Sequence, residues 1–234
     1  MFTKQGKDNL SWRIRFQVGK IIKGFFGNPS TKKCEGNVLS GYSEASQDLF
    51  VVRMTQSKKQ GTYIEIGSGH PINSNNSYLL ESEYGWRGVS VELSTGLVQE
   101  FRAVRSNPVV NSDATLLDYS TLFKEYKLPK EIDYLQIDID PALQSLETLR
   151  GIPFQEYKFS VITFEHDRYR ASRKIAKESR NILHGFGYNL VVKNLTLDTL
   201  KPFEDWWVHP DLVPKKISAK FQSAMKKPKH FDWN

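Results

Sequence analysis

Residues 63–92 read YIEIGSGHPINSNNSYLLESEYGWRGVSVE. A β-rich run at 63–66 ends in a turn with two glycines, Gly67 and Gly69, and a helix candidate at 76–84 leads to a second β-rich run at 88–92. A strand, a helix and a second strand in this order predict a βαβ unit with parallel strands. The glycines let backbone amides approach a ligand where the first strand ends.

The same alternation continues along the chain. We predict further strands at 109–111, 132–139, 159–164 and 188–193, and helices at 43–56, 95–106, 120–126, 142–150 and 169–183, the first of them capped by Ser43. This order predicts a doubly wound α/β fold of the Rossmann-like type, with a mostly parallel sheet and helices on both faces. We place this domain at residues 42–210, between a basic N-terminal helical extension (1–41) and a basic C-terminal tail (211–234).

Composition excludes several classes of protein. The 234 residues include 14 Phe, 10 Tyr and 5 Trp, which can fill a sizeable core, so global disorder is excluded. The sequence has no run of 18 apolar residues and no apolar signal-peptide region near its start, so we expect neither a membrane-spanning helix nor secretion. Cys34 is the single cysteine, which excludes an intrachain disulfide and fits a reducing cytoplasm.

The net charge of +7 is concentrated at the two ends of the chain. Because the excess of basic residues lies in the extensions, it does not indicate which ligand the core binds, and we do not expect nucleic acid as the partner. At residues 11–26, apolar side chains recur at helical spacing between basic ones. This helix either packs on the core with its lysines in water, which we favour, or lies on a membrane surface or a partner.

The predicted strand ends carry candidate ligand contacts. In an open parallel sheet, ligands bind at the carboxyl ends of the strands, where the strand order reverses. Glu92 ends the second strand 23 residues after Gly69, close to the spacing of the acid that accepts the ribose hydroxyls in dinucleotide-binding proteins. The glycine turn and Glu92 together predict a ligand that contains adenosine.

Two further acids favour S-adenosylmethionine over a dinucleotide. Glu65, just before the glycines, suits the cationic end of a ligand and would repel a pyrophosphate. After the third strand, Asp113 and Ala114 form an acidic and small pair that can hold an adenine amino group. The alternative for Asp113 is the N-cap of a helix.

Four runs, at 42–50, 63–71, 76–81 and 85–92, resemble the FkbM-type class I methyltransferases, and the resemblance covers roughly residues 42–210. It implies a seven-stranded methyltransferase sheet, S-adenosylmethionine as methyl donor and an oxygen acceptor, commonly a sugar or polyketide hydroxyl. By position it assigns Glu65, Gly67 and Gly69 to the turn at the methionine end, Glu92 to the ribose, and Asp113 with Ala114 to the adenine.

The fourth strand ends in Asp138-Ile139-Asp140-Pro141, where many relatives resemble Asp-x-Glu-Gly, so the proline changes the turn. Asp138 and Asp140 share one face of the strand, and we expect both to point toward the cleft, with Asp140 near the acceptor.

The fifth strand ends in Glu165-His166-Asp167. Asp138, His166 and Glu165 are the catalytic candidates, and two chemistries are open for this group. His166 or Asp138 acts as general base without a metal, or Asp138, Glu165 and Asp167 bind Mg²⁺ or Mn²⁺. A helix-capping cluster that begins with Asp167 is the structural alternative.

Trp206 and Trp207 lie near the end of the predicted domain. They stack on a sugar ring, or they lie in the core of an antiparallel final strand; the sequence leaves both open. The sequence thus predicts an S-adenosylmethionine-dependent O-methyltransferase that acts on a hydroxyl of a sugar or another small molecule. The alternatives are a nucleic-acid methyltransferase and a non-catalytic module of a glycan-building protein.

Overall fold

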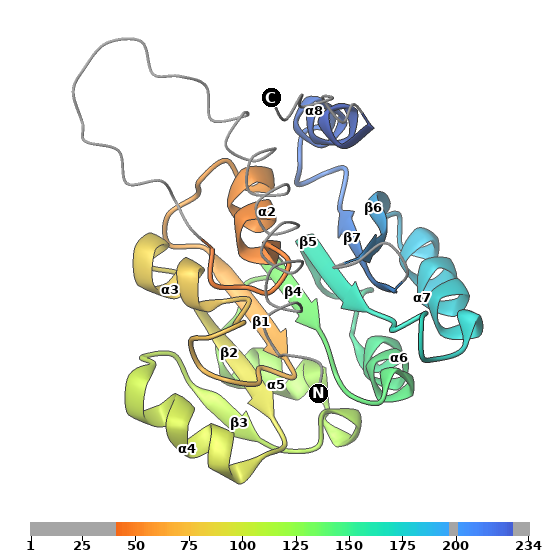
Figure 1. Ribbon diagram of the computed structural model, residues 1–234. Helices are drawn as coiled ribbons and strands as arrows, with labels where there is room; N and C mark the ends of the chain where they lie inside the picture. The colour runs from red at the N-terminus through yellow and green to blue at the C-terminus, as the bar shows by residue number, and fades with distance from the viewer. Residues whose placement is uncertain (1–40, 197–200, 227–234) are drawn as a thin grey trace, which may run out of the picture.

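The computed structural model describes residues 41–196 and 201–226 (Figure 1). Its centre is a seven-stranded sheet in the order β3-β2-β1-β4-β5-β7-β6. The first five strands pair in parallel, and β7 runs antiparallel to both β5 and β6. The mostly parallel sheet predicted from the sequence is confirmed. The strands are β1 (Thr62–Ile66), β2 (Arg87–Glu92), β3 (Val109–Asn111), β4 (Glu131–Ile137), β5 (Lys158–Glu165), β6 (Asn189–Thr196) and β7 (Pro202–Val208).

Helices lie on both sides of the sheet, and the strand order reverses between β1 and β4 (Figure 1). The carboxyl ends of β1, β2, β4 and β5 therefore meet along one edge, which is where a ligand is expected. The helices are α2 (Gln47–Met54), α3 (Tyr78–Tyr84), α4 (Thr95–Val104), α5 (Tyr119–Glu125), α6 (Ala142–Gly151), α7 (Arg173–Gly185) and α8 (Lys215–Lys226), with a 3₁₀ helix η1 (Ala114–Leu116).

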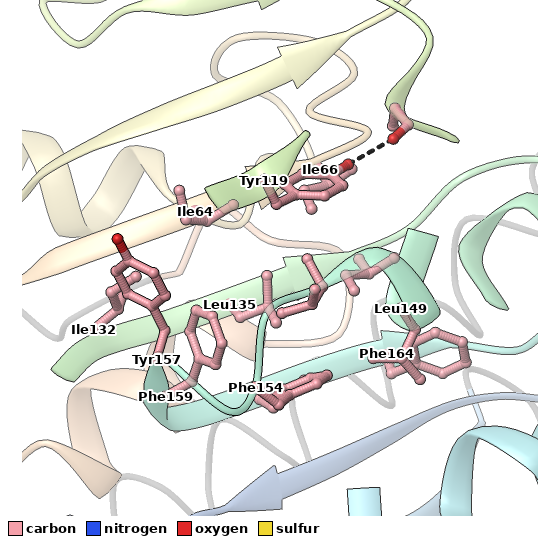
Figure 2. Close-up of a cluster of buried hydrophobic side chains, with 14 of the residues drawn as sticks. Ile64, Ile66, Tyr119, Ile132, Leu135, Leu149, Phe154, Tyr157, Phe159 and Phe164 are labelled. Atoms are coloured by element: carbon pink, nitrogen blue, oxygen red, sulfur yellow. Dashed lines mark hydrogen bonds between the residues drawn. The ribbon is translucent and has the colours of Figure 1, made fainter. Parts of the chain in front are cut away.

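One face of the sheet is covered by α5, α6 and α7. Figure 2 shows Ile64, Ile66 and Leu135 from the central strands packed with Phe159 and Tyr119. Side chains alternate along a strand, so the neighbouring residues of β1 point to the opposite face. Because helices cover both faces, the central strands β1 and β4 are buried almost throughout, including their polar residues Glu65 and Gln136.

The opposite face is covered by α2, α3 and α8. Phe50 of α2 stacks on Trp206 of β7, with ring centroids 4.6 Å apart, and contacts Phe221 of α8 edge-to-face. Phe221 is fully buried. The domain boundary predicted at residue 210 is therefore too early: within 211–226 the expected tail includes a helix that contributes to the core. The 3.6-residue spacing of Ile217 and Phe221 is the signal for this helix.

Two helices begin later than predicted. The first starts at Gln47, and the expected cap Ser43 instead donates its hydroxyl to buried Asp48 at 2.6 Å. α7 starts at Arg173 and is capped by Ser172, so Asp167 does not begin it. The predicted N-terminal helix and Cys34 lie outside the described residues. Within the described ranges, no helix is long and apolar enough to cross a membrane.

Candidate functional site

The two glycines of the turn after β1 have different surroundings. Gly67 has a φ of +78°, and a Cβ there would lie 1.8 Å from the carbonyl oxygen of Asp138, because the ends of β1 and β4 approach closely. Gly69 has a φ of +59°, but a Cβ there would meet no atom within 4 Å. Gly67 is thus required by the fold, whereas Gly69 borders open space at the edge where the ligand is expected.

Glu92 lies against this turn. Its Oε2 accepts a hydrogen bond from the backbone N–H of Gly69 at 2.9 Å, and its Oε1 accepts one from the N–H of Ser94 at 2.8 Å. The carboxylate is only half-buried. The structure therefore brings together the turn and the acid that the sequence paired across 23 residues. The contact of Glu92 with a ribose stays a prediction.

Glu65 is placed differently from the expectation. It is fully buried, and its oxygens accept hydrogen bonds from the N–H of Asn76 and from the hydroxyls of Ser77 and Ser90, the last two at 2.8 Å. Burial raises its pKa. Because Glu65 points to the face covered by α2 and α3, its carboxylate is held by the protein and offers no free charge to a cationic ligand. It fixes the segment between β1 and α3 instead.

Asp113 adopts the alternative that the sequence left open. Its carboxylate caps η1 by accepting hydrogen bonds from the N–H and the hydroxyl of Thr115, which lower its pKa. Ala114 is buried beside it. The carboxylate is thus occupied as a cap, and contact of this pair with an adenine stays a prediction.

Sequence reasoning missed a set of exposed apolar side chains. Of the six large apolar side chains that are exposed in the described part of the chain, four follow the carboxyl ends of strands: Leu93 after β2, Leu116 after β3, Leu143 after β4 and Tyr169 after β5. Leu93 and Leu116 are 65% and 81% exposed. These four side chains follow strands whose carboxyl ends lie along the edge where a ligand is expected. For Leu93, the available signal was its position directly after the strand-end acid Glu92.

A group of carboxyl side chains lies at the ends of β4 and β5. Asp138 and Glu165 are hydrogen-bonded, and Glu204 of β7 lies opposite Glu165 in the antiparallel register. Burial raises the pKa of Asp138 to about 6. Burial and the Asp138 carboxylate raise the pKa of Glu165 far more strongly, so Glu165 carries the proton of the pair. Glu204 was missed because its position depends on the β5–β7 pairing.

The predicted metal site is not formed. Among the residues that the structure describes, no group of three or more His, Cys, Asp or Glu side chains is arranged to hold a metal ion. Asp167 accepts a hydrogen bond from Arg170, which also pairs with exposed Asp140 at 2.6 Å. Because Glu165 is protonated and Asp167 is paired with a guanidinium, Asp138, Glu165 and Asp167 do not present three free carboxylates to Mg²⁺ or Mn²⁺.

His166 does not fit the role of general base. The ring is fully buried, its Nδ1 accepts the N–H of Arg168, and its Nε2 lies 3.3 Å from Asp205. Asp205 also binds Arg180 at 2.7 Å, and these partners outweigh burial and lower its pKa. Both nitrogens of His166 thus face groups of the protein and not solvent. The ring joins β5 to β7, and Asp138 remains as the candidate base.

The tryptophans are also core residues. Trp206 and Trp207 are both fully buried on opposite faces of the sheet, the first on Phe50 and the second against His184 of α7. Their expected stacking on a sugar is therefore wrong, because helices cover both rings. The antiparallel final strand that the sequence left open is the observed arrangement.

Two polar side-chain atoms in the segment after β1 have no hydrogen-bond partner among the residues that the structure describes. In the described ranges, the hydroxyl of Ser68 and the Oδ1 of Asn76 are buried without a protein hydrogen-bond partner. Buried polar atoms are normally satisfied, so these two lack a partner, which the described part of the protein does not supply. Together with the open space at Gly69, they make the residues after β1 a suitable cradle for the polar end of S-adenosylmethionine.

Comparisons with known proteins agree with the architecture. No family model and no curated protein matches the sequence. Among solved structures, human methyltransferase 10 domain containing protein is similar at 12% identity, with a TM-score of 0.50 over 88% of this chain and 99% of that one. Also similar is an rRNA methylase from Streptococcus thermophilus, at 8% identity and a TM-score of 0.47 over 69% of this chain and 94% of that one. Aeropyrum pernix fibrillarin with natively bound S-adenosyl-L-methionine is similar at 14% identity, with a TM-score of 0.45 over 64% of this chain and 67% of that one. The sheet and the likeness to the human protein show that the chain has the Rossmann-like fold of class I methyltransferases.

Proposed function

We propose that the protein is a methyltransferase that uses S-adenosylmethionine to methylate a hydroxyl group of a sugar or glycan. The observation that carries the proposal is the contact between the Gly69 N–H and the Glu92 carboxylate at the adjoining ends of β1 and β2. This contact fixes an acid beside a glycine turn at the edge where Rossmann-like sheets bind adenosine.

Each part of that edge has a role in binding the donor. Glu92 would hold the ribose hydroxyls, and exposed Leu93 and Leu116 would cover the faces of the adenine. Ser68 and Asn76 would hold the polar methionine end. When bound, S-adenosylmethionine supplies an electrophilic methyl group. The protein then has to align the acceptor and take up one proton.

Asp138 is suited to take up that proton. It is half-buried at the end of β4, and its pKa of about 6, raised by burial, leaves it ionised but basic at neutral pH. Protonated Glu165 stabilises the Asp138 carboxylate by a hydrogen bond. Removal of a hydroxyl proton by Asp138 is consistent with an oxygen acceptor.

The charge of the same region supports a carbohydrate over a nucleic acid. The candidate base Asp138 is close to two further carboxylates, Asp140 and Asp167, and Arg170 is the cation that pairs with both of these. Carboxylates accept hydrogen bonds from adjacent sugar hydroxyls, whereas they repel a phosphate backbone.

Calorimetry with S-adenosylhomocysteine tests donor binding. We expect the intact protein to bind it, and Glu92→Ala to weaken binding by about tenfold or more, which is about 1.4 kcal/mol. Glu83→Ala, which removes an exposed carboxylate on α3, is the control and should bind normally. Absence of binding heat from the intact protein would contradict the proposal.

Methyl transfer from a labelled donor then tests the acceptor. The panel contains free sugars, glycans and RNA, each with and without EDTA. Label in the sugars or glycans supports the proposed acceptor, and label in RNA alone would replace it with a nucleic acid. The chelator shows whether transfer requires a divalent cation.

A further inference from the structure

Arg105 is a buried arginine directly after α4. Its side chain is fully buried, and its cation lies 4.5 Å from the ring centre of Phe101. Burying a guanidinium is costly unless its N–H groups are satisfied. Here they donate to Glu81 Oε2, the Pro71 carbonyl, Asn75 Oδ1, the Ser77 hydroxyl and the Tyr63 hydroxyl, at distances of 2.8 to 3.3 Å.

Three of these acceptors belong to the segment between β1 and α3. Asn75 links Arg105 to the glycine turn, because its Nδ2 donates to the carbonyl of Ser68 at 3.1 Å while its Oδ1 accepts from Arg105. Ser77 links Arg105 to Glu65, to which its hydroxyl donates at 2.8 Å. Arg105 is thus one side chain away from the backbone between Gly67 and Gly69.

We propose that Arg105 is a positioning residue that fixes the glycine turn in the conformation required to bind the methyl donor. The identity of the donor rests on the proposed function, whereas the coupling between Arg105 and the turn does not. The guanidinium has five N–H donors and reaches all five acceptors, whereas the ammonium of lysine has only three, so lysine cannot replace it.

Hydrogen exchange in the protein without ligand tests the coupling. In Arg105→Lys, we expect the amides of residues 67–77 to exchange faster than in the wild type. Asp133→Asn is the matched control, because it removes the buried carboxylate of another ion pair, at the amino end of β4, whose partner Lys58 is half exposed. Asn75→Ala keeps the Arg105–Glu81 ion pair and is the second variant if Arg105→Lys does not fold. Unchanged exchange at 67–77, or an equal increase in the control, would overturn the proposal.

Binding of S-adenosylhomocysteine separates positioning from general stability. We expect Arg105→Lys to bind about tenfold more weakly, while Asp133→Asn binds as the wild type does. In turnover, the KM for the donor should rise and that for the acceptor should not. If the wild type does not bind S-adenosylhomocysteine, the proposed function fails, and the exchange experiment alone decides the role of Arg105. Equal affinity of Arg105→Lys and Asp133→Asn for S-adenosylhomocysteine would contradict the positioning role of Arg105.

Discussion

Glu204 makes the stability of this protein depend on pH. The side chain is buried on β7 and accepts hydrogen bonds from Gln47 at 3.0 Å and Trp206 at 2.8 Å. Burial nevertheless raises its pKa from 4.5 to about 8. A carboxyl group with a raised pKa in the folded state stabilises the protein below the unfolded value, and this stability is lost as the pH rises through the folded value. At 1.36 kcal/mol per pKa unit, the loss between pH 4.5 and 8 is about 5 kcal/mol.

Glu204→Gln should remove this dependence. The amide oxygen can accept both hydrogen bonds and does not ionise, so we expect equal stability of variant and wild type near pH 4.5. At pH 9, the variant should be about 5 kcal/mol more stable, or about 10 °C higher in Tm. Urea denaturation at pH 5, 7 and 9 measures the difference, with exposed Glu83→Gln as control. A difference between Glu204→Gln and wild type that is the same at all three pH values would refute the reasoning.

Three further substitutions test the site. Asp138→Asn should lower kcat by about 100-fold, which is the scale of general-base catalysis. In the wild type, kcat should rise through pH 6 as Asp138 loses its proton, and the variant should lack this rise. An unchanged pH profile in steady-state kinetics would exclude Asp138 as the base. Gly67→Ala should destabilise the fold by about 3 kcal/mol or more in urea denaturation, because its Cβ would overlap the Asp138 carbonyl. Gly69→Ala should cost only about 1 kcal/mol and instead lose S-adenosylhomocysteine binding; retained binding would show that the space at Gly69 is not the donor site.

The sequence alone determined the order of the elements and the edge of the sheet where a ligand is expected. Strand periodicity, glycines in a turn and an acid at a strand end are local patterns, so residues 63–92 predict their own structure with little help from the rest of the chain. The pairing of the Gly69 turn with Glu92 was predictable for the same reason, since the two strands are consecutive and parallel.

Only the tertiary structure decided which polar side chains are free to act. His166 is occupied by Asp205 because β7 returns antiparallel beside β5, and the same pairing places Glu204 opposite Glu165. Trp206 is buried by α2 and α8. These contacts join residues far apart in the chain. Whether a carboxylate, an imidazole or an indole is exposed depends on what is packed against it, and a local sequence pattern does not contain that information.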